Sequence, residues 1–462
     1  MPISSGNEVR TRNILLLIIL LNAFTNPFLG AAVNIALPRI GDEFSMNAIS
    51  LSWVAMAFLL SSAVFLVPFG KVADMVGRKK IFLIGNAVIT FSALLCVLSV
   101  SGGMLIAFRA LQGLGSAMTF GTGIAIITSA FPARERGKAI GISVTAVYLG
   151  LSVAPFLGGI LTGAFGWRSL FLVTIPVGLL VLLLTRLAIR DEWAEARDET
   201  FDYRGAAVYM AAISALMYGF SQLPDPAAIA LTGAGLGGII AFIRIELRTA
   251  FPVLDIRLFR GNRTFAFSNL AALINYAATF AITFLLSLYL QYIKGLSPAG
   301  SGTLLVIQPL LMTVFASVSG RLSDRYDPRI LSSAGMAVIV VGLVLLAGLS
   351  PATSGGYIMV SLAILGAGFG MFSSPNTNAV MGSVDKRYLG VASATVGTMR
   401  LTGQMMSMGI ATLVIHVFVG KAPVTPANHD LFMKSVTTVF VLFSILCFLG
   451  VFASLARGKK KS

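Results

Sequence analysis

The sequence predicts an all-α integral membrane protein with fourteen transmembrane helices, and composition is the first reason. Of 462 residues, 56% are hydrophobic and 11% are charged, and the mean hydropathy is +0.89. A soluble domain with a single core is less apolar than this. The chain also has repeated apolar runs of the roughly 20 residues that cross a bilayer. The predicted spans are 13–37, 50–70, 81–99, 103–130, 139–162, 169–189, 203–223, 227–246, 264–292, 298–320, 330–349, 355–380, 389–418 and 432–456.

The positions of the charged residues support the same prediction. None of the 18 Asp and Glu residues falls in the interior of a span. Of the 34 Lys and Arg residues, 27 fall on the side of the N-terminus, five fall on the other side, and Arg109 and Arg400 lie within spans. Basic residues accumulate on the cytoplasmic side of membrane proteins. We therefore expect a multi-pass protein of the cell (inner) membrane with both termini in the cytoplasm, and the net charge of +16 requires no nucleic acid.

A short internal repeat predicts how the spans are grouped. The sequence Gly-Lys-Val-Ala-Asp at 70–74 recurs 250 residues later as Gly-Arg-Leu-Ser-Asp at 320–324. Subtracting the span pair at 203–248, about 46 residues, leaves about 204 residues, which is the length of six spans. We therefore expect an N-terminal six-helix bundle at 1–189, a linker with two additional transmembrane helices at 190–263, and a C-terminal six-helix bundle at 264–462.

Several motifs connect this arrangement to a known family. The sequence from Gly70 to Lys80 is similar to the motif G-x-x-x-D-x-x-G-R-[RK] of the major facilitator superfamily. Residues 34–38 match N-x-A-L-P, residues 109–115 match R-x-x-Q-G-x-G, and residues 150–159 resemble the antiporter motif of the fifth span. Over almost its full length the chain resembles the fourteen-span drug:proton antiporters. The resemblance implies alternating-access export of small amphipathic compounds, driven by a proton gradient.

The same motifs imply roles for particular residues. Gly70 would let two helices approach, Gly77 would permit a tight turn, and Asp74 would accept from a helix N-terminus near Gly390 while facing Arg78. The alternative for this stretch is a solvated loop whose charge only sets topology. The predicted switch residues are Gly70, Asp74, Gly77, Arg78, Lys79, Gly320, Asp324 and Arg325. The predicted packing residues of the fifth span are Gly150, Pro155, Gly158 and Gly159.

Two positions depart from the family pattern. Ala154 replaces a glycine of the fifth-span motif, and Leu29 occupies a position where many of these antiporters carry aspartate. Proton coupling therefore cannot be carried over from the family. The alternative function is a facilitator or importer of a neutral or anionic small molecule.

Polar residues inside the spans indicate a candidate substrate cavity. Arg109 and Arg400 each lie in a helical stripe of small and polar residues, and we expect both to face a cavity because an unpaired cation in lipid is so unfavourable. For the glycines of these stripes, helix packing is the better interpretation. Since arginine stays protonated, this cavity should favour neutral, zwitterionic or anionic compounds. The predicted cavity residues are Asn22, Asn26, Arg109, Gln112, Tyr276, Gln291, Gln308, Asn376, Asn378, Arg400 and Gln404.

An enzyme is the competing class of function. The only histidines are His416 and His429, and the spans contain no metal cluster or acid–base pair. We therefore expect no enzyme, no cofactor and no metal, and a monomer whose partners are the bilayer and a small-molecule substrate. A sensor that does not transport would leave the repeated motif and the two arginines unexplained.

Overall fold

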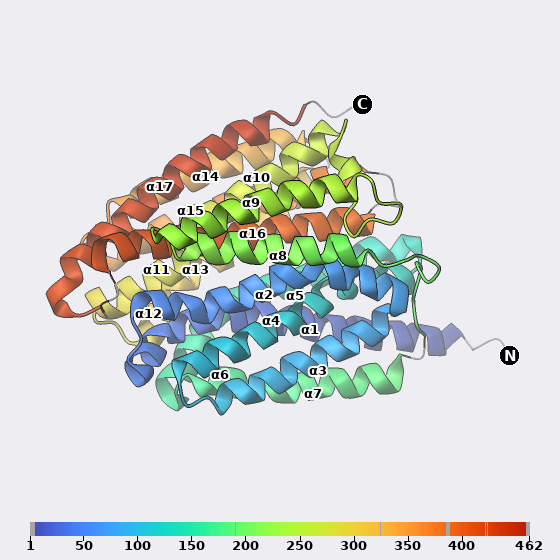
Figure 1. Ribbon diagram of the computed structural model, residues 1–462. Helices are drawn as coiled ribbons and strands as arrows, with labels where there is room; N and C mark the ends of the chain where they lie inside the picture. The colour runs from blue at the N-terminus through green and yellow to red at the C-terminus, as the bar shows by residue number, and fades with distance from the viewer. Residues whose placement is uncertain are drawn as a thin grey trace.

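The computed structural model describes residues 5–189, 191–323, 325–384, 389–420, 422 and 424–458. Within these residues the chain is helical and has no β-strand, which confirms the predicted all-α fold class. Long helices lie side by side, and both ends of the described chain lie at the same end of the molecule (Figure 1). That end is called the terminal side below, and the other end is called the far side.

The first part of the chain makes six helical passes. Gly77, with φ at +132°, allows the sharp reversal between the second and third passes. The helices are α1 (Ser5–Phe44), α2 (Ala48–Val76), α3 (Arg78–Val97), α4 (Gly102–Ala130), α5 (Ala133–Phe165), and α6 (Arg168–Leu172) with α7 (Thr174–Ala188) as a single pass. α1 packs against α5, α2 against α4, and α3 against α4 and α7.

The last part of the chain repeats this packing. Its elements are α10 (Arg263–Thr279), α11 (Ile282–Leu288), η2 (Tyr289–Ile293), α12 (Pro298–Leu305), α13 (Ile307–Leu322), α14 (Pro328–Ala347), α15 (Gly355–Met381), α16 (Leu389–Val419), η4 (Pro426–Asn428) and α17 (His429–Leu455). α10 packs against α16, α13 against α15, and α14 against α15 and α17. These pairs occur in the same order as the pairs of the first part.

Two further helices lie between the two parts in sequence. α8 (Tyr203–Ser221) and α9 (Pro226–Glu246) pack against each other, and α8 also contacts α2 and α16. The pair therefore covers the line along which α2 and α16 meet (Figure 1). A short 3-10 helix, η1 (Ile256–Phe259), follows before α10. The domain limits at 189 and 264 stay a prediction.

The number of membrane spans is close to the prediction. All fourteen predicted spans fall on helical segments. Within the described residues, thirteen helices are long and apolar enough to cross a membrane, judged by length and composition. α8 is not among the thirteen.

Side-chain caps explain where several helices begin. A polar side chain that accepts a hydrogen bond from a free N–H of the first turn stabilises a helix start. Asn47 does this for α2 by accepting from the Ser50 N–H at 2.8 Å. The caps of α4, α8, α10, α12 and α15 are Ser101, Asp202, Asn262, Ser297 and Ser354.

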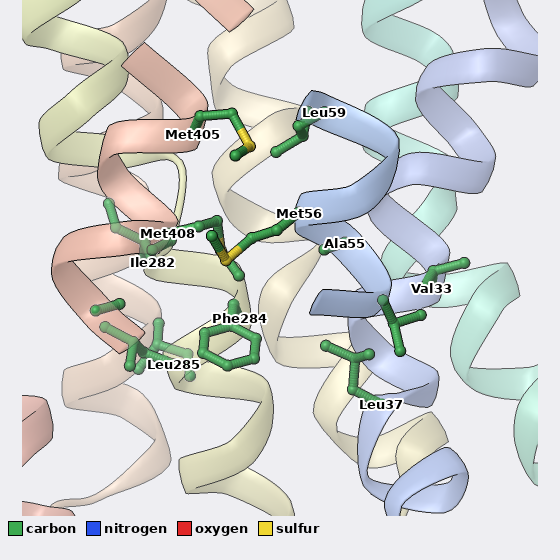
Figure 2. Close-up of a cluster of buried hydrophobic side chains, with 14 of the residues drawn as sticks. Val33, Leu37, Ala55, Met56, Leu59, Ile282, Phe284, Leu285, Met405 and Met408 are labelled. Atoms are coloured by element: carbon green, nitrogen blue, oxygen red, sulfur yellow. The ribbon is translucent and has the colours of Figure 1, made fainter. Parts of the chain in front are cut away.

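Apolar side chains join the first and last parts of the chain towards the far side. Met405 and Met408 of α16 point towards Met56 and Leu59 of α2, with Phe284 of α11 beside them (Figure 2). Each of these side chains is at most 4% exposed. Methionine fills irregular gaps because its side chain is flexible. The two parts are thus packed directly against each other at this level.

Candidate functional site

Arg400 lies where the first and last parts of the chain meet. It belongs to α16, and its guanidinium carbon is 4.8 Å from the centre of the Phe120 ring of α4. The side chain is half-buried, and its Nε atom has no hydrogen-bond partner in the part of the chain that the structure describes. Within the described part of the chain, no Asp or Glu forms an ion pair with it. Because Phe120 covers the face of the guanidinium, the N–H groups along its edges stay available to another partner.

Hydroxyl and aromatic groups surround this arginine. The Tyr148 hydroxyl of α5 is 2.9 Å from the Ser373 hydroxyl of α15, which links the two parts of the chain. Tyr276 of α10 packs edge-on against Phe369 of α15, with ring centres 5.5 Å apart. Arg400 and Tyr276 both lie close enough to Tyr148 to interact with it electrostatically. The structure therefore brings two predicted residues, Arg400 and Tyr276, to one site.

Tyr148, Ser373 and Phe369 complete this site, and the sequence analysis did not select them. The only signal was their position on spans that the resemblance already placed around a cavity. Phe120 lies eleven residues, about three turns, after Arg109 in α4, on the same stripe of the fourth span. A stripe gives the face of a helix, but it does not say which neighbouring helix that face meets.

Arg109 and Gln112 lie within the first part of the chain, between α4 and α2. Arg109 is 1% exposed, and its Nε donates to the Val54 carbonyl at 3.1 Å. Its Nη1 donates to Gln112 Oε1, and its guanidinium carbon is 4.6 Å from the Phe58 ring centre. Backbone and amide oxygens thus accept two hydrogen bonds from this cation, and no carboxylate of the described residues forms an ion pair with it. In this structure Arg109 holds two helices together, and its predicted contact with a substrate cavity stays a prediction.

Asn22 and Asn26 line a small polar cavity away from Arg400. Asn22 Nδ2 donates to Asn86 Oδ1 at 2.6 Å, and Asn26 Nδ2 donates to Asn22 Oδ1 at 3.3 Å. Together with Thr90 and Thr174, these residues enclose a cavity of about 20 Å³ between α1, α3 and α7. Such a volume holds about one water molecule. It is too small for an amphipathic substrate, and a substrate-binding role for the two asparagines stays a prediction.

The remaining predicted cavity residues are spread over the last part of the chain. Gln291 of η2 donates from Nε2 to the Ile35 carbonyl at 3.0 Å, which ties α1 to the last part near the far side. Asn376 is 2% exposed and its Oδ1 has no hydrogen-bond partner among the residues described, whereas Asn378 donates to Ser323 Oγ at 2.7 Å. Gln308 and Gln404 are half-buried. Of this group, Gln291 joins the two parts of the chain.

The predicted switch on the terminal side is centred on Arg78. The residue is buried, and its Nε donates to Asp74 Oδ1 at 2.7 Å, as the spacing of four residues predicts. Its Nη1 donates to Ser129 Oγ at 2.6 Å and to Glu195 Oε1 at 2.9 Å, and Nη2 donates to Glu195 Oε2 at 3.3 Å. Forked contacts of this kind fix the orientation of the arginine.

Glu195 belongs to an acidic segment, residues 191–202, which we call the strap. The Glu192 carboxylate accepts from the backbone N–H groups of Lys79 and Lys80, at 2.8 and 3.1 Å, at the N-terminus of α3. Glu199 pairs with Lys71, and the strap also donates from the Ala196 N–H to the Asp74 carbonyl at 2.9 Å. A carboxylate is favourable at a helix N-terminus. The strap therefore binds the switch through charge, and the sequence analysis missed it.

The two glycines of the first switch motif, Gly70 and Gly77, have different surroundings. A Cβ at Gly70 would meet no atom within 4 Å, so Gly70 does not mark a close helix approach here. At Gly77 a Cβ would lie 2.5 Å from Glu192, so this glycine serves both the turn and the strap. Gly320 lies close to Ser374, and Arg325 is exposed. Asp324 and residues 385–388, which precede α16, lie outside the described residues.

The fifth-span glycines lie where helices approach closely. A Cβ at Gly150 would be 2.4 Å from the Phe24 carbonyl oxygen, and one at Gly158 would be 2.8 Å from Ala32 Cβ, both on α1. On another face, a Cβ at Gly159 would be 2.6 Å from the Pro298 carbonyl oxygen of α12. A Cβ at Gly302 of α12 would be 2.0 Å from the Pro155 carbonyl oxygen. α5 thus packs on α1 and on the last part of the chain at once.

Two charged side chains expected at the membrane surface are buried instead. Glu246, the last residue of α9, is 1% exposed, although the hydropathy pattern places it at the edge of a span. Arg457, just after α17, is also 1% exposed and donates to Ser332 Oγ at 3.3 Å. Burial lowers the pKa of Arg457 to about 9. The composition does not predict that Glu246 and Arg457 are buried, because their burial depends on how the neighbouring loops fold back over them.

Comparisons with known proteins agree with this architecture. The family model described as the Major Facilitator Superfamily matches residues 19–408 and 269–461. The riboflavin transporter RibZ of Clostridioides difficile is 29% identical over 452 residues, covering 95% of this chain and 96% of that protein. The multidrug resistance protein Stp of Mycobacterium tuberculosis is 30% identical over 389 residues, covering 83% and 72% of the two chains.

Solved structures give the same fold. A bacterial homologue of the human lysosomal transporter Spinster, in an inward-facing and unoccupied conformation, matches with a TM-score of 0.70, covering 98% of each chain at 17% identity. The human organic anion transporter MFSD10 matches with a TM-score of 0.65, covering 97% of this chain and 99% of that one at 15% identity. At these identities the likeness shows the fold alone.

Proposed function

Because this chain belongs to the Major Facilitator Superfamily, we propose that it is a secondary active transporter that exports small amphipathic compounds from the cytoplasm by alternating access. A relative named as a multidrug resistance protein supports export. A rocking motion of the first part of the chain against the last would expose the region around Arg400 to each side of the membrane in turn. Proton antiport is the driving reaction we propose.

The observation that carries the proposed substrate class is the environment of Arg400. A cation over an aromatic ring gains about 0.5–2 kcal/mol, and a hydrogen bond to a charged group contributes about 1.5–3 kcal/mol. An anionic substrate can bind the free edges of the guanidinium while Phe120 keeps its face. A cationic substrate would be repelled by Arg400 and would find no carboxylate on it within the described residues. We infer a preference for neutral, zwitterionic or anionic amphiphiles.

The strap and the switch supply a gate on the terminal side for this cycle. Arg78 is bound at once by Asp74 of α2 and by Glu195 of the strap. α2 also packs against α16, which carries Arg400. A movement of α2 relative to α16 would thus be transmitted to the contact between Arg78 and Glu195. We infer that this contact is made in one state of the cycle and weakened in the other.

A second candidate is facilitated passage or import of a planar, neutral or anionic compound such as a flavin. The name of the relative RibZ, together with its full-length match, supports this alternative. The rings of Phe120, Tyr148, Tyr276 and Phe369 around Arg400 would suit a flat aromatic ligand. No interior carboxylate is needed for uncoupled passage.

The test uses purified protein in liposomes and an anionic fluorescent amphiphile as the probe. Arg400→Gln should lower its transport at least about tenfold, because one charge-assisted contact is lost, and Arg400→Lys should restore only part of the rate. Arg244→Gln is the matched control, since Arg244 is exposed at the end of α9. Equal rates for the wild type and Arg400→Gln, for both the anionic probe and riboflavin, would refute a substrate-binding role for Arg400.

A further inference from the structure

Glu246 is a buried carboxylate, and one of its oxygens has no hydrogen-bond partner among the described residues. It ends α9 on the terminal side, and the neighbouring Arg244 and Arg248 are exposed. Its Oε2 accepts from the Leu254 N–H at 3.1 Å, whereas its Oε1 is buried without a hydrogen-bond partner. No ion pair to it is found in the part of the chain that the structure describes. Burying an ionised carboxylate in this way is strongly unfavourable.

The unsatisfied oxygen lies beside a second carboxylate. A Cβ at Gly205 would be 2.5 Å from Glu246 Oε1 and 2.3 Å from Asp202 Oδ2, so the two oxygens flank the same glycine. Asp202 caps α8 through Oδ1, which accepts from the Gly205 N–H at 2.9 Å. Its Oδ2 accepts only a long bond, 3.4 Å, from the Thr249 hydroxyl. The two carboxylate oxygens therefore lie within about 5 Å of each other, and neither accepts a short hydrogen bond from the described residues.

The other charged groups nearby are already engaged. Asp255 Oδ1 accepts from the Arg257 N–H at 3.0 Å, and Arg257 Nη2 donates to the carbonyls of Leu247 and Thr249, at 3.4 and 3.0 Å. Asp255 and Asp202 are the charges that act on Glu246, and both are negative. Like charges favour the neutral form of one member of such a pair.

We propose that Glu246 takes up a proton from the water on the terminal side. The protonated Oε1 then donates a hydrogen bond to Asp202 Oδ2, so that the two residues hold one proton between them. On release, the proton returns to that water and leaves two adjacent carboxylates that repel each other. This proton-binding site includes none of the predicted switch or cavity residues. It stands whatever compound the chain transports and in whichever direction.

The shared proton would fasten two segments that bind different parts of the molecule. Asp202 ends the strap, which is bound to Arg78 and Lys71. Glu246 directly precedes the second linker, residues 247–262, in which Leu258 and Phe259 pack against a buried cluster of Phe265, Val380 and Ala392. Protonation therefore ties the strap to the last part of the chain, and loss of the proton releases this tie.

Infrared difference spectroscopy on the purified full-length protein tests the proton directly. Protonated carboxyl groups have a C=O absorption that ionised carboxylates lack. As pH rises from about 5 to about 9, the wild type should lose such a band, and Glu246→Gln should lack that component throughout. Asp198→Asn, in an exposed position of the strap, is the control and should match the wild type. In Asp202→Asn the component should disappear at a pH lower by about one unit, because the neighbouring charge is gone.

Tryptic cleavage of the second linker at the exposed Arg257 gives an independent readout. In the wild type, cleavage should be about fivefold faster at the alkaline end than at the acidic end, because opening exposes the site. Glu246→Gln imitates the protonated form and should be cleaved slowly at every pH. Identical spectra for the wild type and Glu246→Gln would overturn the proposal. So would a band that sodium or calcium removes at constant pH, since the pair would then bind a metal cation.

Discussion

Removing the charge of Glu195 should loosen the strap from the turn between α2 and α3. The Arg78 side chain is 10% exposed and the Glu195 side chain is 67% exposed. Exposed ion pairs contribute about 0.2–1 kcal/mol, and the forked geometry and buried arginine place this pair near the upper end. Glu195→Gln should therefore cost about 1 kcal/mol, which raises the population of released strap roughly fivefold.

Asp74→Asn should have a smaller effect on the strap by itself. Its contact with Arg78 joins residues four apart at a helix end, and such pairs contribute about 0.3–0.5 kcal/mol. The double variant should exceed the sum of the two, because it leaves a buried guanidinium with no carboxylate. Removing the partners of a buried charge costs about 3–5 kcal/mol, so release should rise far beyond the roughly tenfold product of the single effects.

Trypsin cleavage at Arg197, which is exposed in the strap, measures this release. Rates are divided by those of the denatured variant, so that altered recognition by the protease cancels. Asp191→Asn is the control, because Asp191 is an exposed acid of the same segment. A double variant whose effect equals the sum of the single effects, or cleavage that none of the changes alters, would refute the view that Arg78 is shared between Asp74 and the strap.

Three other predictions follow from the topology, the switch and the helix packing. Single cysteines at Arg197 and Lys294, in a background without Cys96 and Cys447, should be labelled by an impermeant reagent in intact cells only at Lys294; labelling at Arg197 would contradict cytoplasmic termini. Asp74→Asn should lower transport while expression holds, and unchanged transport would reduce Asp74 to a loop charge. Gly302→Val should reduce the yield of folded protein, because a Cβ there would be 2.0 Å from the Pro155 carbonyl oxygen and overpacking costs about 1–3 kcal/mol. Gly300→Val is its control, with a nearest atom at 3.4 Å, and equal yields would contradict this packing.

The sequence was enough to predict the fold class and the position of each helix. A bilayer requires long apolar helices, so hydropathy alone locates them. Local features were also accessible: Gly77 adopts positive φ at a turn, and Asp74 meets Arg78 across one helical turn. In each case the partners are close in sequence, and the geometry follows from helix periodicity.

The strap, the burial of Glu246 and the role of Arg109 could not be derived in this way. The strap docks on residues more than a hundred positions away in the sequence. The only signal was that the strap is acidic and the turn between α2 and α3 is basic. Glu246 sits at the edge of an apolar run, where the pattern cannot tell a buried side chain from a solvated one. Arg109 and Arg400 occupy similar stripes, yet one packs on its neighbour within the first part and the other faces across the interface. These outcomes depend on tertiary contacts.

The most direct test of the central claim is transport by the purified protein in liposomes, with and without a pH gradient. An anionic amphiphile and an ethidium-like cation are compared under the same conditions. We predict that the anionic compound is transported, and faster with the pH gradient than without it. We predict little transport of the cation, because Arg400 lies between the two parts of the chain and no carboxylate of the described residues pairs with it. Rapid gradient-driven export of the cation with no transport of the anion would contradict the account.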